Sequence, residues 1–204
     1  MKTIAVQKKT SVRNVRMLTM TAVLSAIAFV LAFFEFPVPL SPSFARMDLS
    51  DLPALIGAFA FGPLSGVWIE LVKNVLQLPT SSTGGIGELA NFIMGSSFVA
   101  AAEFIYGYRR TERNAAAACL IASVIMGIVA AVVNYFILLP LFEAFMPLDQ
   151  LITSFGEYIP FIRTKLDVVL FNAFPFNLLK GIGISAVTLI LYRRLVPVLE
   201  GRQK

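Results

Sequence analysis

The chain contains no histidine and a single cysteine, Cys119. Without histidine it can form neither a Ser-His triad nor a histidine-based metal site, and one cysteine cannot form an internal disulfide. The sequence G-x-x-x-x-G-K-[ST] is also missing, so the chain has no P-loop with which to bind ATP. We therefore expect no catalytic residues, no metal ligands and no cofactor, and a protein that is not an enzyme.

Charged residues are scarce as well. They make up 14% of the chain, against about 25% in typical soluble domains, whereas hydrophobic residues make up 57%. This composition predicts a membrane protein of the all-α class. With 204 residues there is room for one compact helical domain over residues 1–204, and for no second, soluble domain.

Apolar runs separated by proline, glycine or charged residues predict a bundle of six transmembrane helices. The first run follows five basic residues and could be a signal peptide, but it is longer than the usual apolar core and no clear cleavage site follows. We therefore expect it to be retained. Residues 142–167 are mixed in character and predict a long loop with a surface helix. The predicted helices cover about residues 15–35, 52–62, 63–78, 86–107, 115–140 and 168–193.

The basic residues concentrate in three places, namely the N-terminal tail, the turn at 107–114 and the tail after Tyr192. If the second and third predicted helices both cross the membrane, all three places lie on one side of it. The positive-inside rule makes that side cytoplasmic, so both termini are predicted to be cytoplasmic. The net charge of +5 then reflects orientation and contact with anionic lipids, and not the binding of nucleic acid.

Lys180 is the only charged residue between Asp167 and Arg193, in a segment long enough to cross a bilayer. A lysine near the middle of such a segment costs about 2.5–3.5 kcal/mol on insertion, so it requires a partner, a cavity or a ligand. Asn177 lies one helical turn earlier on the same face, and Asn134 lies on the preceding helix. Amides and an ammonium group suit a neutral heterocycle with alternating carbonyl and N–H groups. The structural alternative is that these residues only hydrogen-bond the helices to one another.

Two further pairs of polar residues lie at helical spacing. Glu70 and Lys73 predict an internal ion pair on the third helix, which could serve either structure or function. Glu88 and Asn91 form a similar pair at the start of the fourth predicted helix. Polar pairs inside membrane helices commonly join helices, so their spacing alone does not separate a structural role from ligand binding.

Residues 48–51, with the sequence Asp-Leu-Ser-Asp, directly precede the second predicted helix. They are expected at the membrane interface, where Ser50 or Asp51 caps the helix or the segment covers the mouth of a pocket. That depth argues against an aspartyl membrane protease, which needs two carboxylates inside the membrane. On the first helix, Ala22 and Ala26 form a small-x-x-x-small pattern, which lets another helix approach closely, either from this chain or from a partner.

Four segments carry a family resemblance by their order and spacing. They are residues 47–66, 70–76, 87–95 and 174–181, the last of which reads Phe-Pro-Phe-Asn-Leu-Leu-Lys-Gly. Together they resemble the substrate-binding S components of energy-coupling factor (ECF) vitamin transporters, and most of all the riboflavin-specific members. The resemblance covers nearly the whole chain. It implies a six-helix bundle in the bacterial plasma membrane that captures riboflavin from outside.

The resemblance also implies partners and residue roles. The partners would be a transmembrane coupling subunit, docked at Ala22 and Ala26, and two cytoplasmic ATPases that supply the energy. Residues 35–50 match a gating loop over the pocket. Riboflavin is then a transported ligand and not a cofactor. The substrate-binding residues that the resemblance implies are Asn134, Asn177, Lys180, Asn91 and Glu88.

Two alternatives stay open at this point. One keeps the S-component fold with a different vitamin or heterocycle, since the polar pattern does not single out a flavin. The other is an intramembrane enzyme that uses Glu70, Lys73 and Glu88. The residue inventory disfavours the enzyme, because it offers no histidine, no catalytic serine motif and no cluster of metal ligands.

Overall fold

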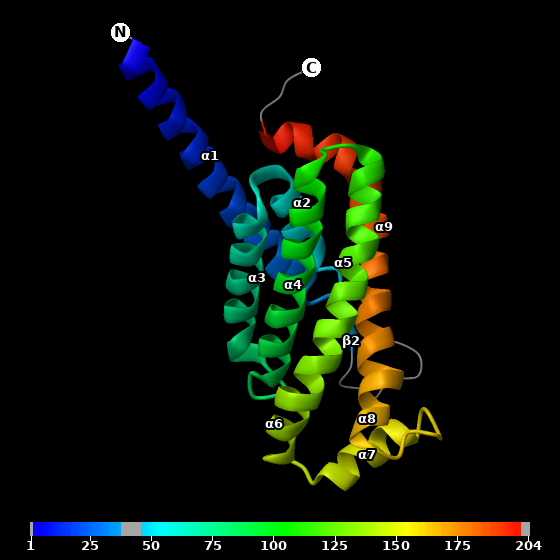
Figure 1. Ribbon diagram of the computed structural model, residues 1–204. Coiled ribbons are helices and arrows are strands. Elements are labelled where there is room, and N and C mark those ends of the chain that lie inside the picture. The colour runs from blue at the N-terminus through cyan, green and yellow to red at the C-terminus, as the bar shows by residue number, and fades with distance from the viewer. Residues whose placement is uncertain (1, 38–45, 201–204) are drawn as a thin grey trace.

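Four long stretches of apolar helix form the frame of the protein (Figure 1). The structure is a computed structural model that describes residues 2–37 and 46–200. Within those residues, four stretches are long and apolar enough to cross a membrane, namely Asn14–Leu31, Ile86–Tyr108, Glu112–Glu143 and Lys165–Tyr192. The main helices in them are α1 (Lys2–Leu31), α4 (Ile86–Tyr108), α5 (Glu112–Val133) and α9 (Phe174–Glu200). The predicted all-α class is confirmed.

Two shorter helices lie between these stretches. Helix α2 (Asp51–Phe61) has 11 residues and α3 (Pro63–Gln77) has 15. At 1.5 Å per residue they are roughly 16 and 22 Å long, less than the roughly 30 Å of a bilayer's hydrocarbon core. Gly62 separates them with a φ of 103°, which favours glycine, and Pro63 begins α3, where its missing N–H is not needed.

Helix α2 occupies the centre of the bundle. It packs against α1, α3, α4 and α9, and nine of its 11 residues are buried. Small residues make this close packing possible, because a Cβ atom placed on Gly66 of α3 would lie 2.8 Å from the Cβ of Ala58 and 3.0 Å from the carbonyl oxygen of Ala54. The sole cysteine, Cys119, is also buried, on α5.

Helices α5 and α9 are each lengthened by a π-helical turn. Turn η2 (Asn134–Leu138) joins α5 to α6 (Leu139–Glu143), and η3 (Val169–Ala173) joins α8 (Lys165–Val168) to α9. A proline follows each turn at the same distance, Pro140 after η2 and Pro175 after η3. The wider hydrogen-bonding pattern of a π turn already leaves one carbonyl without its usual partner, so a proline's missing N–H does little harm there.

Several predicted helix ends are wrong, some because a π turn accommodates a proline and others because helices continue into polar flanks. Pro140 was predicted to end a helix, but the helix continues past it to Glu143 because η2 accommodates the ring. The predicted helices 15–35 and 168–193 are instead Lys2–Leu31 and a continuous run from Lys165 to Glu200. Apolarity marks the part of a helix inside the membrane, whereas backbone hydrogen bonding continues into polar flanks.

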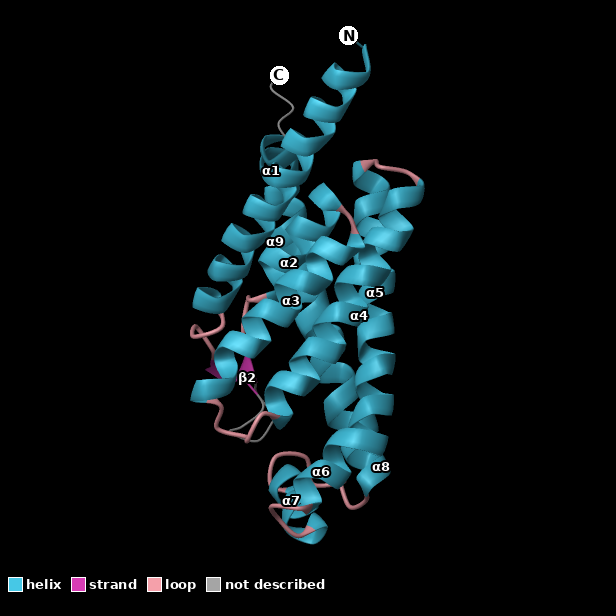
Figure 2. Ribbon diagram, turned by 90° about the vertical axis from the view of Figure 1, so that its left-hand side faces the viewer, coloured by secondary structure: helices cyan, strands magenta, loops and turns pink. Residues whose placement is uncertain are grey.

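The remaining elements form the connections. Residues Leu78–Thr80 form the 3-10 turn η1, and strand β1 (Phe36–Pro37) pairs antiparallel with β2 (Arg46–Met47). The predicted surface helix within 142–167 is α7 (Leu148–Gly156). It packs Leu151 and Phe155 into a second, smaller apolar cluster with residues of α6 and α8. Figure 2 shows α6 and α7 beyond the ends of α3 and α4.

The three basic regions lie at one end of the bundle. Figure 1 shows the start of α1, the turn between α4 and α5, and the end of α9 at the same end, with α7 at the other. A direct contact joins two of these regions, since the Arg16 guanidinium donates hydrogen bonds to the carbonyl oxygens of Val198 and Leu199 at 2.7 and 2.9 Å. This arrangement agrees with the predicted clustering of the basic residues on one side.

Candidate functional site

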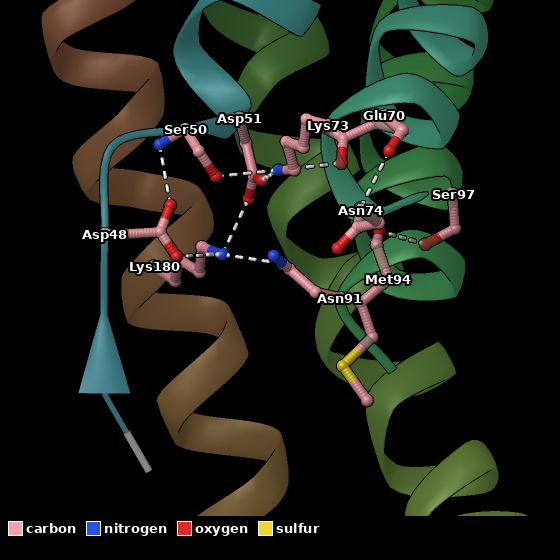
Figure 3. Close-up of polar contacts among 10 residues, drawn as sticks. All are labelled: Asp48, Ser50, Asp51, Glu70, Lys73, Asn74, Asn91, Met94, Ser97 and Lys180. Carbon is pink, nitrogen blue, oxygen red and sulfur yellow. Dashed lines mark hydrogen bonds and ion pairs between the residues drawn. The ribbon is translucent and has the colours of Figure 1, made fainter. Parts of the chain in front are cut away.

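Lys180 on α9 is 4% exposed, and its ammonium nitrogen lies among oxygen atoms from three parts of the chain (Figure 3). It donates a hydrogen bond to Asn91 Oδ1 of α4 at 2.9 Å. It also forms ion pairs with Asp51 Oδ2 of α2 at 3.0 Å and with Asp48 Oδ2, just before α2, at 3.5 Å. The costly charge predicted from the sequence therefore has two carboxylates and an amide as partners.

A second buried lysine, Lys73 on α3, lies beside the first. Its ammonium group pairs with Asp51 Oδ1 and with Glu70 Oε2, the latter at 2.8 Å, and donates to the Ser50 hydroxyl at 2.8 Å. The side chains of Asp51, Glu70 and Lys73 are fully buried. The predicted Glu70–Lys73 ion pair is confirmed. Asp51 is the centre of the cluster, because one of its oxygens faces each lysine.

Local structure explains how these side chains meet. Glu70 and Lys73 lie one turn apart on the buried side of α3. Asp51 lies in the first turn of α2, where free backbone N–H groups favour a carboxylate. Asp48 Oδ1 accepts a hydrogen bond from the Ser50 backbone N–H at 2.6 Å, which closes a turn just before the helix.

Burial makes this cluster sensitive to the loss of any one member. Taking a charge out of water costs several kcal/mol, and removing one partner of a buried ion pair typically destabilises a protein by about 3–5 kcal/mol. Three carboxylates, Asp48, Asp51 and Glu70, surround two ammonium groups in the cluster, so every ion has an opposite charge beside it. The cluster joins α2, α3, α4 and α9 inside the apolar bundle.

The side chains at both ends of residues 48–51 are buried. Asp48 and Asp51 are 7% and 0% exposed, and they pair with the two lysines inside the bundle. Ser50 is the N-cap residue of α2 as predicted, but its side chain makes no capping hydrogen bond and accepts one from Lys73 instead. The tertiary pairing with two lysines overrides the local capping role. The sequence signal that could have revealed it is the opposite charge of Asp51 at the head of an apolar run.

The other predicted substrate residues make local contacts, either with their own helix or with a neighbouring loop. Asn177 is buried and donates its side-chain N–H to Ala173 O at 2.9 Å, and the half-buried Asn134 donates to Ala130 O at 2.8 Å. Each of these amides is thereby fixed against its own helix. Glu88 accepts a hydrogen bond from the Ser81 hydroxyl at 2.7 Å in the loop before α4. Of the five predicted residues, the structure joins Lys180 and Asn91 directly.

The carboxylates of the two other predicted polar pairs make their contacts elsewhere. Glu70 pairs with Lys73, and Glu88 bonds to the loop before α4. A surface hollow of about 500 Å³ lies between α7 and the turn that follows it, and none of the predicted substrate residues lines it. Residues 38–45 of the predicted gating loop lie outside the residues that the structure describes.

The predicted docking residues on α1 point away from the protein's own core. Ala22 and Ala26 are both exposed, and 17% of the surrounding apolar window, Asn14–Leu31, is buried. The buried residues of this stretch include Leu24, Ser25 and Ala28, which face the bundle. Among the helices that the structure describes, the small-x-x-x-small pattern therefore faces outward and not toward a neighbouring helix.

The structure is that of a helical membrane protein, in which an apolar bundle encloses a cluster of charged and amide side chains. The family described as "ECF transporter, substrate-specific component" matches residues 16–192, and the chain belongs to this family. The predicted family is thus confirmed, and with it a role in transport and not in catalysis.

Individual relatives agree with this assignment. The chain is 38% identical to the riboflavin transporter RibU of Staphylococcus aureus (strain TCH60), over 92% of this chain and 94% of the relative. It is 34% identical to the riboflavin transporter FmnP of Bacillus subtilis (strain 168), over 92% and 95% of the two chains. A solved structure described as the S component of a bacterial ECF transporter matches with a TM-score of 0.75 and 36% identity, over 92% of this chain and 99% of the other.

Proposed function

We propose that this chain is the riboflavin-binding subunit of an ECF importer, which captures the vitamin from outside the cell. The assignment of riboflavin as the substrate is supported by the similarity to riboflavin transporters, which extends over more than nine-tenths of this chain and of two relatives. The buried polar cluster within the bundle gives a physical basis for binding a heterocycle. Energy for uptake would come from partner chains, in keeping with the absence of a P-loop.

Asn134, Asn177 and Lys180 would hold the polar edge of the flavin ring, with Asn91 and Glu88 as further contacts. An amide offers both a donor and an acceptor, and an ammonium group adds charge-assisted donors, which together complement alternating carbonyl and N–H groups. Asn177 and Lys180 are both buried on α9, one turn apart. Apolar neighbours would enclose the dimethylbenzene edge, as in most small-molecule sites.

The bundle would cross the plasma membrane six times, with α2 and α3 as the second and third crossings and both termini in the cytoplasm. The clustering of the three basic regions at one end supports this orientation. Helices shorter than the bilayer can be accommodated by local thinning and by their neighbours. Substrate would then enter from the end that carries α7.

The partners would be a transmembrane coupling subunit and two ATPase subunits. Exposed small residues on a membrane helix let a partner helix approach closely, and Ala22 and Ala26 on α1 provide such a surface. Transport requires that the substrate-loaded and empty forms bind the coupling subunit with different affinity.

Riboflavin fluorescence tests the substrate directly. We expect the purified protein in detergent to quench the fluorescence of added riboflavin with saturable, one-to-one stoichiometry, and to co-purify with yellow colour from riboflavin-containing cells. Other vitamins, added in excess, should not reverse the quenching. Lack of quenching would rule out riboflavin as the substrate, and displacement by another vitamin would assign the chain to that vitamin.

A further inference from the structure

The Lys180 ammonium group has three acceptors in the structure, and they are not equivalent. An ammonium group has three N–H donors and no acceptor. Asn91 Oδ1 lies at 2.9 Å, Asp51 Oδ2 at 3.0 Å and Asp48 Oδ2 at 3.5 Å. A substrate carbonyl can therefore gain a hydrogen bond from Lys180 only if one of these acceptors gives up its place.

Asp51 is the acceptor that is held most firmly. It lies within helix α2, it is fully buried, and its second oxygen is fixed by Lys73 of α3. Its Oδ2 atom has no hydrogen-bond partner within the described part of the chain, so its one polar contact there is the ion pair with Lys180. Loss of this contact would leave a buried carboxylate oxygen unsatisfied, which is costly.

Asp48 is held less firmly. Its contact with Lys180 is the longest of the three, at 3.5 Å. It lies outside the helices, between β2 and α2, and its other oxygen is already used by the Ser50 backbone N–H. Its side chain is 10% exposed, against 0% for Asp51, so it can regain water with a smaller movement. Of the two carboxylates, Asp48 is the one that a ligand can replace.

We propose that Asp51 is a positioning residue that holds the Lys180 ammonium group against the substrate, while a carbonyl of the substrate takes the place of Asp48. This inference rests on the proposed function, because it assigns to riboflavin a carbonyl that meets Lys180. Asp51 acts through Lys180 and does not itself touch the substrate. The two carboxylates beside the same lysine thereby have opposite effects on affinity.

Two matched variants separate these effects. Asp51→Asn removes a carboxylate that orients Lys180, and we expect it to weaken riboflavin binding about tenfold or more. Asp48→Asn removes the same charge from the other side of the lysine and keeps an oxygen for the Ser50 N–H, and we expect it to strengthen binding a few-fold. Both affinities are read from riboflavin fluorescence quenching, on protein shown to be monodisperse by size-exclusion chromatography.

A double-mutant cycle tests whether Asp51 acts through Lys180. In a Lys180→Met background, Asp51→Asn should cost no further affinity, whereas a merely structural role would produce the same loss in both backgrounds. Additive losses, or a loss of affinity in Asp48→Asn, would overturn the inference while leaving riboflavin binding established. Failure of the unaltered protein to bind riboflavin would instead overturn the proposed function, and the inference with it.

Folding is kept apart from binding by running the same cycle in the Asp48→Asn background. In the Asp48→Asn protein the cluster keeps two carboxylates, Asp51 and Glu70, and two lysines, so its formal charge is zero. Each single substitution added to it changes that charge by no more than one. If a variant with Asp48 present is unstable, the same substitution is measured in the Asp48→Asn protein instead. The expected result is the same, namely that Asp51→Asn loses its effect once Lys180 is gone.

Discussion

At the scale of single residues, Gly95 is essential to the charged cluster although it carries no side chain. A Cβ atom at this position of α4 would lie 2.5 Å from Glu70 Oε2 and 2.7 Å from Glu70 Cδ. The glutamate is fully buried and paired with Lys73, so it cannot move away without breaking an ion pair. The carboxylate of Glu70 on α3 therefore fits against α4 only because Gly95 has no side chain.

Gly95→Ala should destabilise the protein by about 1–3 kcal/mol, the usual cost of overpacking a well-filled interior. Thermal unfolding in detergent measures this, at about 2–4 °C per kcal/mol for a chain of this size. Gly183→Ala is the matched control, because a Cβ there meets nothing within 4 Å, and alanine favours a helix over glycine. Equal midpoints for the two variants would contradict the packing of Glu70 against Gly95.

The sequence identifies which residues are costly, but not which of them meet. Lys180 was expected to need a partner, and that expectation holds. Its partners, Asp51 and Asp48, lie far away in the chain, and nothing in their spacing distinguishes them from Glu70 or Glu88. Helical periodicity relates residues a few positions apart. It therefore predicted the pair of Glu70 and Lys73 on one helix and failed for pairs between helices.

At the scale of elements, the two π turns show why proline misled the prediction of helix ends. Residues Asn134–Leu138 and Val169–Ala173 each precede a proline by the same interval. Proline ends most helices, so the rule placed a boundary at Pro140. A π turn needs a local change in backbone hydrogen bonding that leaves no simple trace in composition. The starts of α2, α3 and α4 were predicted closely, because glycine and proline mark them.

Helix α7 provides a prediction at this scale. Its buried residues Leu151 and Phe155 anchor it to α6 and α8, whereas Thr153 on the same helix is exposed. Leu151→Ala should cost about 2–3 kcal/mol locally and speed amide hydrogen exchange throughout α7, since this short helix has few other contacts. Thr153→Ala serves as the control. Unchanged exchange in Leu151→Ala would show that α7 is held by other contacts.

At the scale of the whole molecule, composition and charge predicted the class and the general arrangement. Scarce charge and long apolar runs gave an all-helical membrane protein, and the basic regions gathered at one end as expected. These properties are averages over many residues, so single misplaced boundaries do not alter them. The number of crossings is a finer property, because α2 and α3 are short and α3 carries buried charges.

The exposed face of α1 makes a prediction about assembly. A bulky side chain on a surface used for close helix approach prevents the approach without disturbing the chain's own core. Ala26→Phe should therefore abolish riboflavin uptake by cells and co-purification with partner subunits, while the isolated protein still binds riboflavin. Leu120→Phe, at an exposed apolar position of α5, is the control. It should co-purify with the partner subunits and support riboflavin uptake as the natural protein does. Normal riboflavin uptake by cells that carry the Ala26→Phe variant would show that the coupling subunit docks at another surface.

The ion pairs of Asp51 connect a helix that is synthesised early with one that is synthesised late. Asp51 and Lys73 belong to α2 and α3, whereas Lys180 belongs to α9, which leaves the ribosome after them. Until α9 is inserted, the nascent chain holds Asp48, Asp51 and Glu70 with Lys73 as their only ammonium partner in the cluster. The arrival of Lys180 therefore supplies the second of the two ammonium groups that pair with these carboxylates, so the charged cluster at the centre of the bundle is complete only after α9 has been inserted.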